Sequence, residues 1–358
     1  MISFICPVDN SYELLSNFLG LTMPLLQYDD EMILINDCCD SIVLHDFLCR
    51  CTKEDSRIRL IQLSEKSGFG KACNEGVKSA RSDTLFFINT DIILSESCIE
   101  PITALLWSAE DIAAVQPCIL YQQNGRVQST GHVFSDHRSG HLFMGRKPTD
   151  IIIRNDDIRQ ALTLACCAVK KKFFDDFNGF NSYYYNAYEG MELTLKLTLD
   201  GFRCLYCSAG TAYHFSGVAR RNILFDNEHQ RVEFYQTWEG RFCHDLDRYL
   251  EKQLSDEILS SDYIVINFST AHIWDELLEQ MGIQKKIYFL SAGRFRAKVN
   301  LFDLLEYQFI YSSYPILFLC DSIFQLFDNK LWFSIRNGNQ DIAMDINGNL
   351  IHTLEIWQ

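Results

Sequence analysis

The chain is poor in positive charge. Its 358 residues contain 32 Lys and Arg against 47 Asp and Glu, which gives a net charge of -15 at pH 7. Proteins that bind nucleic acid without sequence specificity need a basic surface that neutralises phosphates, so the composition excludes that class of function. The acidic composition does not exclude a substrate that binds together with a cation.

The chain also lacks long uncharged apolar runs. The nearest candidate, Leu304 to Phe327, carries Glu306 and Asp321, so we predict no transmembrane helix. The opening segment Met1–Pro7 has no basic residues before its apolar ones and predicts a first β-strand rather than a secretion signal. We therefore expect a cytoplasmic protein, either free or peripheral at the inner face of the membrane.

Cysteine, in contrast, is abundant, with 14 residues. Most of them lie in apolar stretches, where a free cysteine acts as a small hydrophobe, so we predict no disulfide framework and a reducing compartment. Cys204 and Cys207 form a lone Cys-X-X-Cys in a predicted strand, where positions three apart face opposite sides. A structural zinc site needs four ligands, so we expect both side chains to fill apolar space instead.

The first 120 residues alternate between two kinds of pattern. Short β-branched runs predict strands at Ile2–Cys6, Met32–Ile35, Arg59–Leu63, Leu85–Ile88 and Ala113–Gln116. Helical patterns between them occupy Tyr12–Leu21, Ile42–Leu48, Lys71–Ala80 and Glu96–Trp107. This alternation predicts an α/β fold with a mostly parallel sheet, in which ligands bind at the carboxyl ends of the strands.

The rest of the chain is less regular. Residues 121–250 predict a helix at Glu189–Leu199, a strand at Arg203–Tyr206 and an amphipathic helix at Arg231–Leu250. The alternation restarts near residue 256, with a helix predicted at Ile273–Met281 and strands predicted at Tyr263–Phe268, Lys286–Leu290 and Ile316–Cys320. The tail Leu331–Trp357 contains two Asn-Gly turn signals and predicts an antiparallel meander. We therefore divide the chain into residues 1–250 and 256–358.

The segment that best indicates chemistry is Ser67–Gly76, a glycine pair that opens a helix, together with the Asn89-Thr90-Asp91 turn after the next strand. A carboxylate at the end of a parallel strand suits Mg²⁺ or Mn²⁺, because these ions take few protein carboxylates and complete their shell with substrate phosphates. An isolated Asn-Thr-Asp is common, and on its own it more often has a structural role, in which Asp91 caps the following turn.

The order of these motifs resembles the family 2 glycosyltransferases of the GT-A fold, and most closely the bacterial rhamnosyltransferase-like branch that builds surface polysaccharides. The resemblance runs from Met1 to about Trp238. It rests on the first strand with Pro7 and Asn10, the turn at Ile33–Asp40, Gly68–Gly76, Asn89–Asp91, Ala165–Lys172, Asn178–Phe180, Tyr188–Leu193 with Lys196, Gly201-Phe202, and His214–Gly217.

The resemblance implies a GT-A domain, with a Rossmann-like mixed sheet, over residues 1–250. Residues 1–120 would bind the nucleotide sugar and residues 121–250 would form the acceptor and catalytic part. Residues 256–358 fall outside the resemblance, and we expect a small C-terminal α/β subdomain packed against the transferase or against a second protomer as a homodimer. The alternative is that residues 256–358 form a surface that binds the acceptor or a membrane.

The resemblance also assigns roles to individual residues. Asp91 and His214 would hold a divalent cation, Mn²⁺ or Mg²⁺, that bridges the donor diphosphate. The nucleotide-sugar site would contain Pro7, Asp9, Asn36, Asp37, Gly70, Lys71, Asn74, Asn89, Thr90, Arg220 and Arg221. Structural alternatives stay open for several of these, namely a packed, hydrogen-bonded histidine for His214, a surface helix residue for Lys71, a solvated pair for Arg220 and Arg221, and a packing role for Gly70.

Two positions depart from the family pattern. Asn36 stands where the family's acidic turn begins with Asp. Gly190 stands where the family places its general base, the carboxylate that takes the proton of the acceptor hydroxyl. Glu189 and Glu192 are three residues apart and share a helix face, so we expect one of them to be the base. Glu189 is preferred, because the counterpart of Glu192 is mainly structural.

We therefore expect a metal-dependent inverting glycosyltransferase. Its donor would be a nucleoside-diphosphate sugar, with UDP or dTDP as the nucleotide, and its acceptor a glycan, a lipid-linked glycan or a protein. The first alternative is a catalytically silent GT-A domain that binds a nucleotide sugar or a partner protein. A sugar nucleotidyltransferase is disfavoured, because no Gly-rich loop with Lys or Arg follows the first strand.

Overall fold

The computed structural model describes most of the first 245 residues and separate parts of the remainder. The described residues are 1–8, 11–39, 41–135, 138–144, 147–215, 227–245, 249, 264–269, 274, 287–289, 301, 315–336, 338 and 340–357. Contacts divide the chain into two compact units, Met1–His132 with Lys147–Cys243, and Val133–Arg146 with His244–Gln358. The assignment of functions to residues 1–250 and 256–358 stays a prediction.

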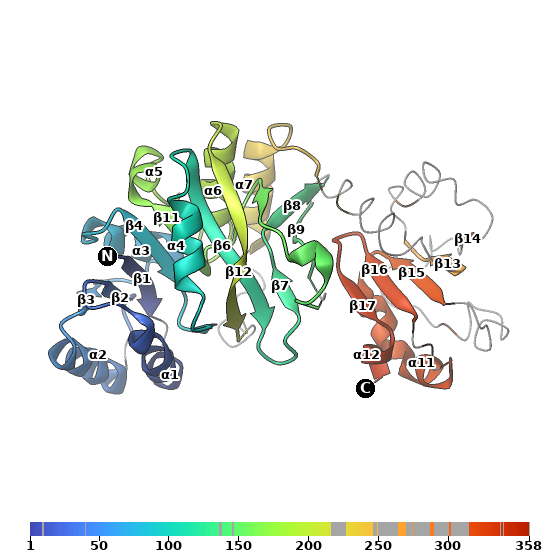
Figure 1. Ribbon diagram of the computed structural model, residues 1–358, viewed down its shortest axis with the longest axis horizontal. Coiled ribbons are helices and arrows are strands. Elements are labelled where there is room, and N and C mark those ends of the chain that lie inside the picture. The colour runs from blue at the N-terminus through green and yellow to red at the C-terminus, as the bar shows by residue number, and fades with distance from the viewer. Residues whose placement is uncertain are drawn as a thin grey trace. The chain divides into compact units, whose positions relative to one another are not determined.

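The first unit begins with a parallel sheet and crossover helices, as the alternation predicts (Figure 1). Its four parallel strands are β1 (Ser3–Val8), β2 (Glu31–Asn36), β3 (Ile58–Gln62) and β4 (Thr84–Ile88). The helices between them are α1 (Tyr12–Thr22), α2 (Ile42–Glu54) and α3 (Phe69–Lys78). Both α1 and α2 begin after a serine whose hydroxyl oxygen accepts an amide proton of the first turn, which fixes where each helix starts.

The sheet becomes mixed beyond β4. Strand β11 (Cys166–Lys170) runs antiparallel to both β4 and β6 (Ile112–Tyr121), and β12 (Arg203–His214) runs parallel to β6. Three short strands, β5 (Ile92–Leu94), β7 (Val127–Ser129) and β10 (Asp157–Arg159), pair with β12 or β6. The main path is β10-β12-β6-β11-β4-β1-β2-β3. Strand β12 extends well past the predicted Arg203–Tyr206 and, after an irregularity between Cys207 and Thr211, ends at His214.

Helices cover both faces of this sheet. The alternating side chains of the central strands divide between two apolar clusters, so that Phe4 and Phe86 belong to one and Ile5 and Phe87 to the other. The first cluster also takes residues of α1, α2 and α4 (Ile99–Leu106), and the second takes residues of α3, α5 (Lys171–Asp176) and α6 (Glu189–Leu199). Short 3₁₀ turns lie at Met23–Leu25 and Ile151–Ile153.

Helix α7 (Asn227–Trp238) corresponds to the predicted amphipathic helix, but it ends twelve residues before the predicted Leu250. Gly240 follows the end of α7 with a φ of +77°, a conformation that glycine adopts readily and that turns the chain away from the helix.

The second unit contains another sheet. Strands β14 (Ile287–Phe289), β13 (Ile264–Asn267), β15 (Ile316–Cys320) and β16 (Ile342–Asp345) are parallel, and β17 (Leu350–His352) pairs antiparallel with β16. These strands fall where the sequence predicts strands, whereas most of the helix predicted at Ile273–Met281 lies outside the described residues. A separate two-stranded sheet joins β8 (His132–Ser135) and β9 (Arg138–His141).

The tail of the second unit is not the predicted meander. It contains a 3₁₀ segment η5 (Ile323–Asn329), helix α11 (Lys330–Arg336), the single hairpin β16–β17 and helix α12 (Leu354–Trp357). Asn347-Gly348 lies in the hairpin turn, as predicted, but the segment before the first Asn-Gly pair is helical. Among the described helices, none has the length and apolar character that crossing a membrane requires.

Candidate functional site

Asp91 and His214, far apart in the sequence, meet in the structure. Asp91 follows β4 in a turn closed by a hydrogen bond from the Ile92 amide to the Asn89 carbonyl. Strand β5 then pairs antiparallel with the end of β12, where His214 lies opposite Ile92. As a result, His214 Nε2 lies 3.1 Å from Asp91 Oδ2, and both side chains are largely buried.

Gln128 on β7 orients the histidine. Its Oε1 lies 2.7 Å from His214 Nδ1, so that Nδ1 carries the proton and donates it to this oxygen. In the neutral ring, the lone pair of Nε2 then points at the Asp91 carboxylate. Two acceptor atoms this close need a proton or a cation between them, and the second hydrogen bond of the ring is typical of a histidine that binds a metal.

The buried oxygens around this pair fit a divalent cation. Asp91 Oδ1 and Asn89 Oδ1 are both buried, and neither has a hydrogen-bond partner among the described residues. In the octahedral shell of Mg²⁺, with ligands at about 2.1 Å, neighbouring ligands lie about 3 Å apart, which matches the separation of the histidine and the carboxylate. The described residues contain no group of three or more His, Cys, Asp and Glu that could hold a metal.

Asn36 and Asp37, at the end of β2, are engaged by neighbouring loops. The buried Asn36 side chain donates to Gln62 Oε1 and accepts from the Cys39 amide. The Asp37 carboxylate accepts from the amides of Ser67 and Gly68 and from the Ser67 hydroxyl, at 2.6 to 2.8 Å. Asp37 therefore shapes the entrance to α3, whereas Asn36 holds the turn after β2. The predicted contact of both residues with the nucleotide stays a prediction.

Helix α3 holds three of the predicted nucleotide-sugar residues. Lys71 is exposed in its first turn. The Asn74 amide group forms two hydrogen bonds with the backbone of Phe180, both of 2.9 Å, and so ties α3 to the segment before α6. A Cβ on Gly70 would lie 2.9 Å from Glu189 Cγ, so the glycine allows α6 to approach α3.

The remaining predicted nucleotide-sugar residues are divided between described and undescribed parts. Pro7 lies half-buried in β1, and Thr90 lies half-buried in the turn that carries Asp91. Asp9, Arg220 and Arg221 lie outside the described residues.

The two glutamates at the start of α6 have different surroundings. Glu192 is buried and accepts from Trp238 Nε1 at 3.1 Å and from Asn181 Nδ2 at 3.3 Å. Its other oxygen lies 3.1 Å from Lys196 Nζ. Burial, with the nearby negative charge of Glu192, raises the pKa of Tyr184 above its ordinary value. Through its hydrogen bond with Trp238, Glu192 links α6 to α7.

Glu189 lies at the first position of α6 and packs against Gly70 of α3. The chain reaches it through two residues in the left-handed region, Asn186 with φ of +60° and Tyr188 with φ of +68°. Asn186 Oδ1 accepts from the Phe69 amide, and the Tyr188 ring packs 5.2 Å from Phe234 of α7. Strained backbone held in place by several contacts is typical of functional sites.

Gly190, at the position where the sequence comparison predicts a departure from the family pattern, faces an apolar side chain. A Cβ at this position would lie 2.9 Å from Leu164 Cβ and 3.0 Å from Leu164 Cδ1. Leu164 is buried in the same apolar cluster as α6. The space next to residue 190 is therefore filled by leucine, so that a carboxylate there requires Leu164 to move.

Sequence reasoning missed several residues of this region. Gln128 lies in a short edge strand with no motif around it, and Leu164 is one apolar residue among many, so neither carried a signal. Trp238 was placed on an amphipathic helix, but its hydrogen bond to Glu192 depends on how α7 packs on α6.

Residues 3–177 match the family model described as Glycosyl transferase family 2. The chain is 25% identical over 196 residues to Uncharacterized protein y4gI of Sinorhizobium fredii, which covers 50% of this chain and 20% of that protein. It is also 25% identical over 185 residues to O-antigen biosynthesis protein RfbC of Myxococcus xanthus, which covers 50% of this chain and 14% of that protein. The chain thus spans a fifth or less of the length of these relatives.

Among solved structures, the crystal structure of GalNAc-T7 with UDP, GalNAc and Mn²⁺ resembles this chain with a TM-score of 0.55 and 13% identity. The likeness covers 79% of this chain and 55% of that chain. At this identity it bears on the fold alone. The chain therefore has the GT-A fold, and its residues 3–177 carry the sequence pattern of glycosyl transferase family 2.

Proposed function

We propose that this chain is a metal-dependent, inverting glycosyltransferase that uses a nucleoside-diphosphate sugar. The observation that carries the proposal is the Asp91–His214 pair at the strand ends. Beside it lie two buried oxygens, Asp91 Oδ1 and Asn89 Oδ1, that have no hydrogen-bond partner in the described part of the chain. Asp91 and His214 hold the divalent cation, Mn²⁺ or Mg²⁺. When bound, this ion neutralises the charge that develops on the departing nucleoside diphosphate.

Glu189 is the residue that we assign as general base. Its carboxylate takes the proton of the acceptor hydroxyl while that oxygen attacks the anomeric carbon from the face opposite the leaving group. The contacts of Asn186 and Tyr188 hold the start of α6 before the substrate arrives, which lowers the cost of orienting the carboxylate. Glu192 has contacts with Trp238, Asn181 and Lys196 that suit a structural role.

The relatives guide the choice of substrates. One resembles this chain and is named an O-antigen biosynthesis protein, and one solved structure of similar fold binds UDP and Mn²⁺. We propose a UDP- or dTDP-sugar as donor and a surface glycan as acceptor, with lipid-linked glycans and proteins as the alternatives. A rhamnosyltransferase-like specificity, a cytoplasmic location and a homodimer through residues 256–358 stay predictions.

A catalytically silent GT-A domain is the second candidate, and one observation favours it. Gly190 carries no carboxylate, and Leu164 fills the adjoining space. Such a domain would bind a nucleotide sugar and be stabilised by it, without turnover of any donor.

Substitution of Asp91 tests the proposal. We expect the purified chain with Mn²⁺ to hydrolyse UDP- or dTDP-sugars slowly, and Asp91→Ala to lower this rate at least about 100-fold, since a metal ligand that stabilises transition-state charge is lost. Asp83→Ala is the matched control, because Asp83 is an exposed carboxylate at the opposite end of β4. Hydrolysis by Asp91→Ala at the rate of the unmodified chain would exclude the metal site. Thermal stabilisation by a donor without hydrolysis would favour the silent domain.

A further inference from the structure

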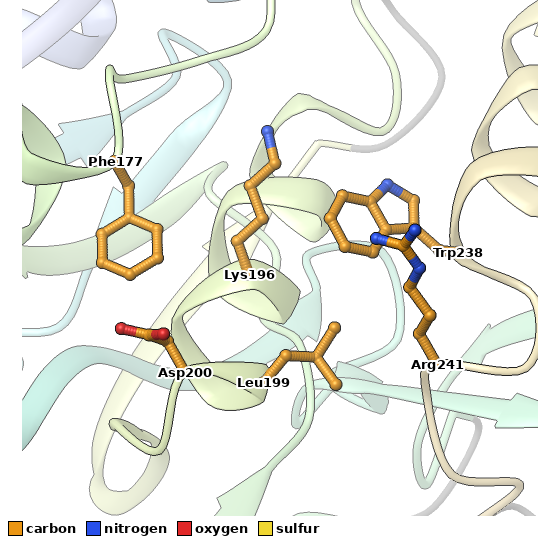
Figure 2. Close-up of a pocket in the computed structure, with 6 residues that line it drawn as sticks. All are labelled: Phe177, Lys196, Leu199, Asp200, Trp238 and Arg241. Carbon is orange, nitrogen blue, oxygen red and sulfur yellow. The ribbon is translucent and has the colours of Figure 1, made fainter.

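A groove of about 330 Å³ lies where the C-terminal end of α6 meets the residues that follow α7 (Figure 2). Nothing in the proposed catalytic site uses it. Its walls combine apolar side chains with charged groups of both signs, supplied by Phe177, Lys196, Leu199, Asp200, Trp238 and Arg241.

Two cations of the groove are held in fixed positions by the same indole. The Lys196 ammonium lies 5.7 Å from the Trp238 ring centroid, and the Arg241 guanidinium lies 5.5 Å from it. The Trp238 N–H in turn donates to Glu192, which also pairs with Lys196. Figure 2 shows the Lys196 side chain between Phe177 and Trp238, with Arg241 across the indole. These contacts order the hydrogen-bond donors before any ligand binds, which reduces the entropy lost on binding.

The groove lies along the same face of α6 as the proposed base. Glu189, Glu192, Lys196 and Asp200 follow one another at intervals of three and four residues, so they form one stripe on the helix. At 1.5 Å per residue, the groove begins about 10 Å from Glu189, at Lys196. A ligand in the groove is therefore too far from Glu189 to react. It is close enough to be another unit of an oligosaccharide acceptor whose reacting hydroxyl lies at Glu189.

The lining matches the chemistry of a sugar ring. A sugar presents C–H groups to apolar and aromatic surfaces and hydroxyls to both donors and acceptors. Phe177 and Leu199 supply the apolar surface, Lys196 and Arg241 supply donors, and the Asp200 carboxylate accepts. The Lys196 charge is balanced by Glu192, and Asp200 and Arg241 add one charge of each sign to the lining, so the lining favours an uncharged ligand over an anion.

We propose that this groove is an accessory subsite that binds an uncharged sugar unit of the acceptor glycan, away from the unit that is modified. The inference rests on the proposed transferase function, since it assigns the groove to the acceptor. It predicts that the chain binds oligosaccharides better than monosaccharides, because only an oligosaccharide reaches both the groove and Glu189.

Glycan capture without donor or metal tests the subsite separately from catalysis. The fluorescently labelled chain of 358 residues would be applied to an array of bacterial glycans, and affinity for the captured glycans would be measured by titration. We expect Arg241→Ala and Leu199→Trp each to weaken capture about tenfold or more, the first by removing a charged donor and the second by filling the groove. Leu21→Trp is the matched control, since Leu21 is 45% exposed and Leu199 is 44% exposed, and it should leave capture unchanged.

Each outcome bears on the proposal. Capture that survives both groove variants, or a chain that captures no glycan on the array, overturns the subsite. Thermal melting of each variant shows that it is folded, and the exposed positions of Leu199 and Arg241 make folding of both expected. A chain that hydrolyses its donor but captures no glycan would remove the subsite alone. A chain that captures glycans through the groove but hydrolyses no donor would remove the transferase proposal alone.

Discussion

Gly190 and Leu164 form a complementary pair, because the missing side chain of one makes room for the other. A Cβ at residue 190 would lie 2.9 Å from Leu164, closer than packed carbon atoms allow. The pair explains how α6 packs in this position without a side chain at residue 190. It also means that placing an aspartate at residue 190 requires two substitutions rather than one.

We expect Gly190→Asp to lower the free energy of unfolding by about 1–3 kcal/mol, since the new side chain overpacks against Leu164. In a Leu164→Ala background the same substitution should cost less, because the alanine frees the space that the new side chain needs. Urea denaturation of the wild type, both single variants and the double variant gives the coupling between the two sites. Purely additive effects would mean that the two side chains do not compete for space.

The two glutamates of α6 should respond differently to the loss of charge. Glu189→Gln should lower kcat of sugar transfer by about 100-fold or more, because glutamine cannot take the acceptor proton, with little change in melting temperature. Glu192→Gln should lower the melting temperature, because it breaks the ion pair with Lys196. The measurements are steady-state kinetics and thermal unfolding of both variants. Full activity of Glu189→Gln would exclude Glu189 as the base.

At the residue scale, the sequence predicted which two residues form the Asp91–His214 pair better than it predicted the contacts of individual side chains. It named Asp91 and His214, which the strands bring together, because both residues belong to recognisable motifs. It also assigned Asn74 to the donor, which stays a prediction, and the structure adds that the Asn74 amide bonds the Phe180 backbone. An amide suits a ligand and a backbone segment equally well, so only the path of the neighbouring loop distinguishes these uses.

At the scale of elements, the sequence predicted the helices and strands that have a regular apolar pattern. It missed those whose extent depends on pairing between strands or on helix capping. Residues 208–210 of β12 resemble a turn, yet the chain continues to His214 because its last residues pair with both β6 and β5. The aromatic run in α11 resembles a strand. The capping box of Ser322 and Gln325 starts a helical segment directly before it, so the chain enters α11 already helical.

The hairpin β16–β17 contains a buried carboxylate whose titration should be measurable. Burial raises the pKa of Asp345 to about 6, although four hydrogen bonds from Asn347, Asn349 and Ile323 favour its ionised form. An acid with a raised pKa binds its proton more tightly in the folded state. Its contribution to stability is therefore complete below the unfolded value near 4 and is lost as the pH rises to about 6.

We expect Asp345→Asn to remove this part of the pH dependence. Between pH 4 and pH 6.5 the free energy of unfolding of the wild type should fall relative to that of the variant, by on the order of 2–3 kcal/mol. Urea unfolding at several pH values measures the difference, and Asp328→Asn on the exposed surface of η5 serves as the control. Parallel curves for the wild type and Asp345→Asn would contradict the raised pKa.

At the scale of the whole molecule, the Asp91–His214 pair joins segments 123 positions apart, so an ion held by both should stabilise the folded state. We expect Mn²⁺ at about 100 times its dissociation constant to add roughly 2.7 kcal/mol, or on the order of 5 °C in melting temperature. Asp91→Asn should abolish the shift and Asp83→Ala should keep it. A shift of equal size in all three proteins would place the bound ion elsewhere.

The division of the chain into two compact units was harder to predict from the sequence than the first sheet. Residues 133–146 lie within the predicted acceptor part, but their contacts group them with the C-terminal unit. Contacts such as the hydrogen bond from the Leu350 amide to the Met144 carbonyl join residues about 200 positions apart, and local pattern contains no information about such pairs.

The cysteines have a consequence for experiments in solution. Cys204 and Cys207 belong to apolar clusters on opposite faces of the first sheet, and Cys320 lies in the core of the second unit. Burial raises the pKa of these thiols, so they react with alkylating reagents only when the surrounding structure opens. The rate at which each thiol is labelled therefore reports the opening of its own unit, without any introduced probe.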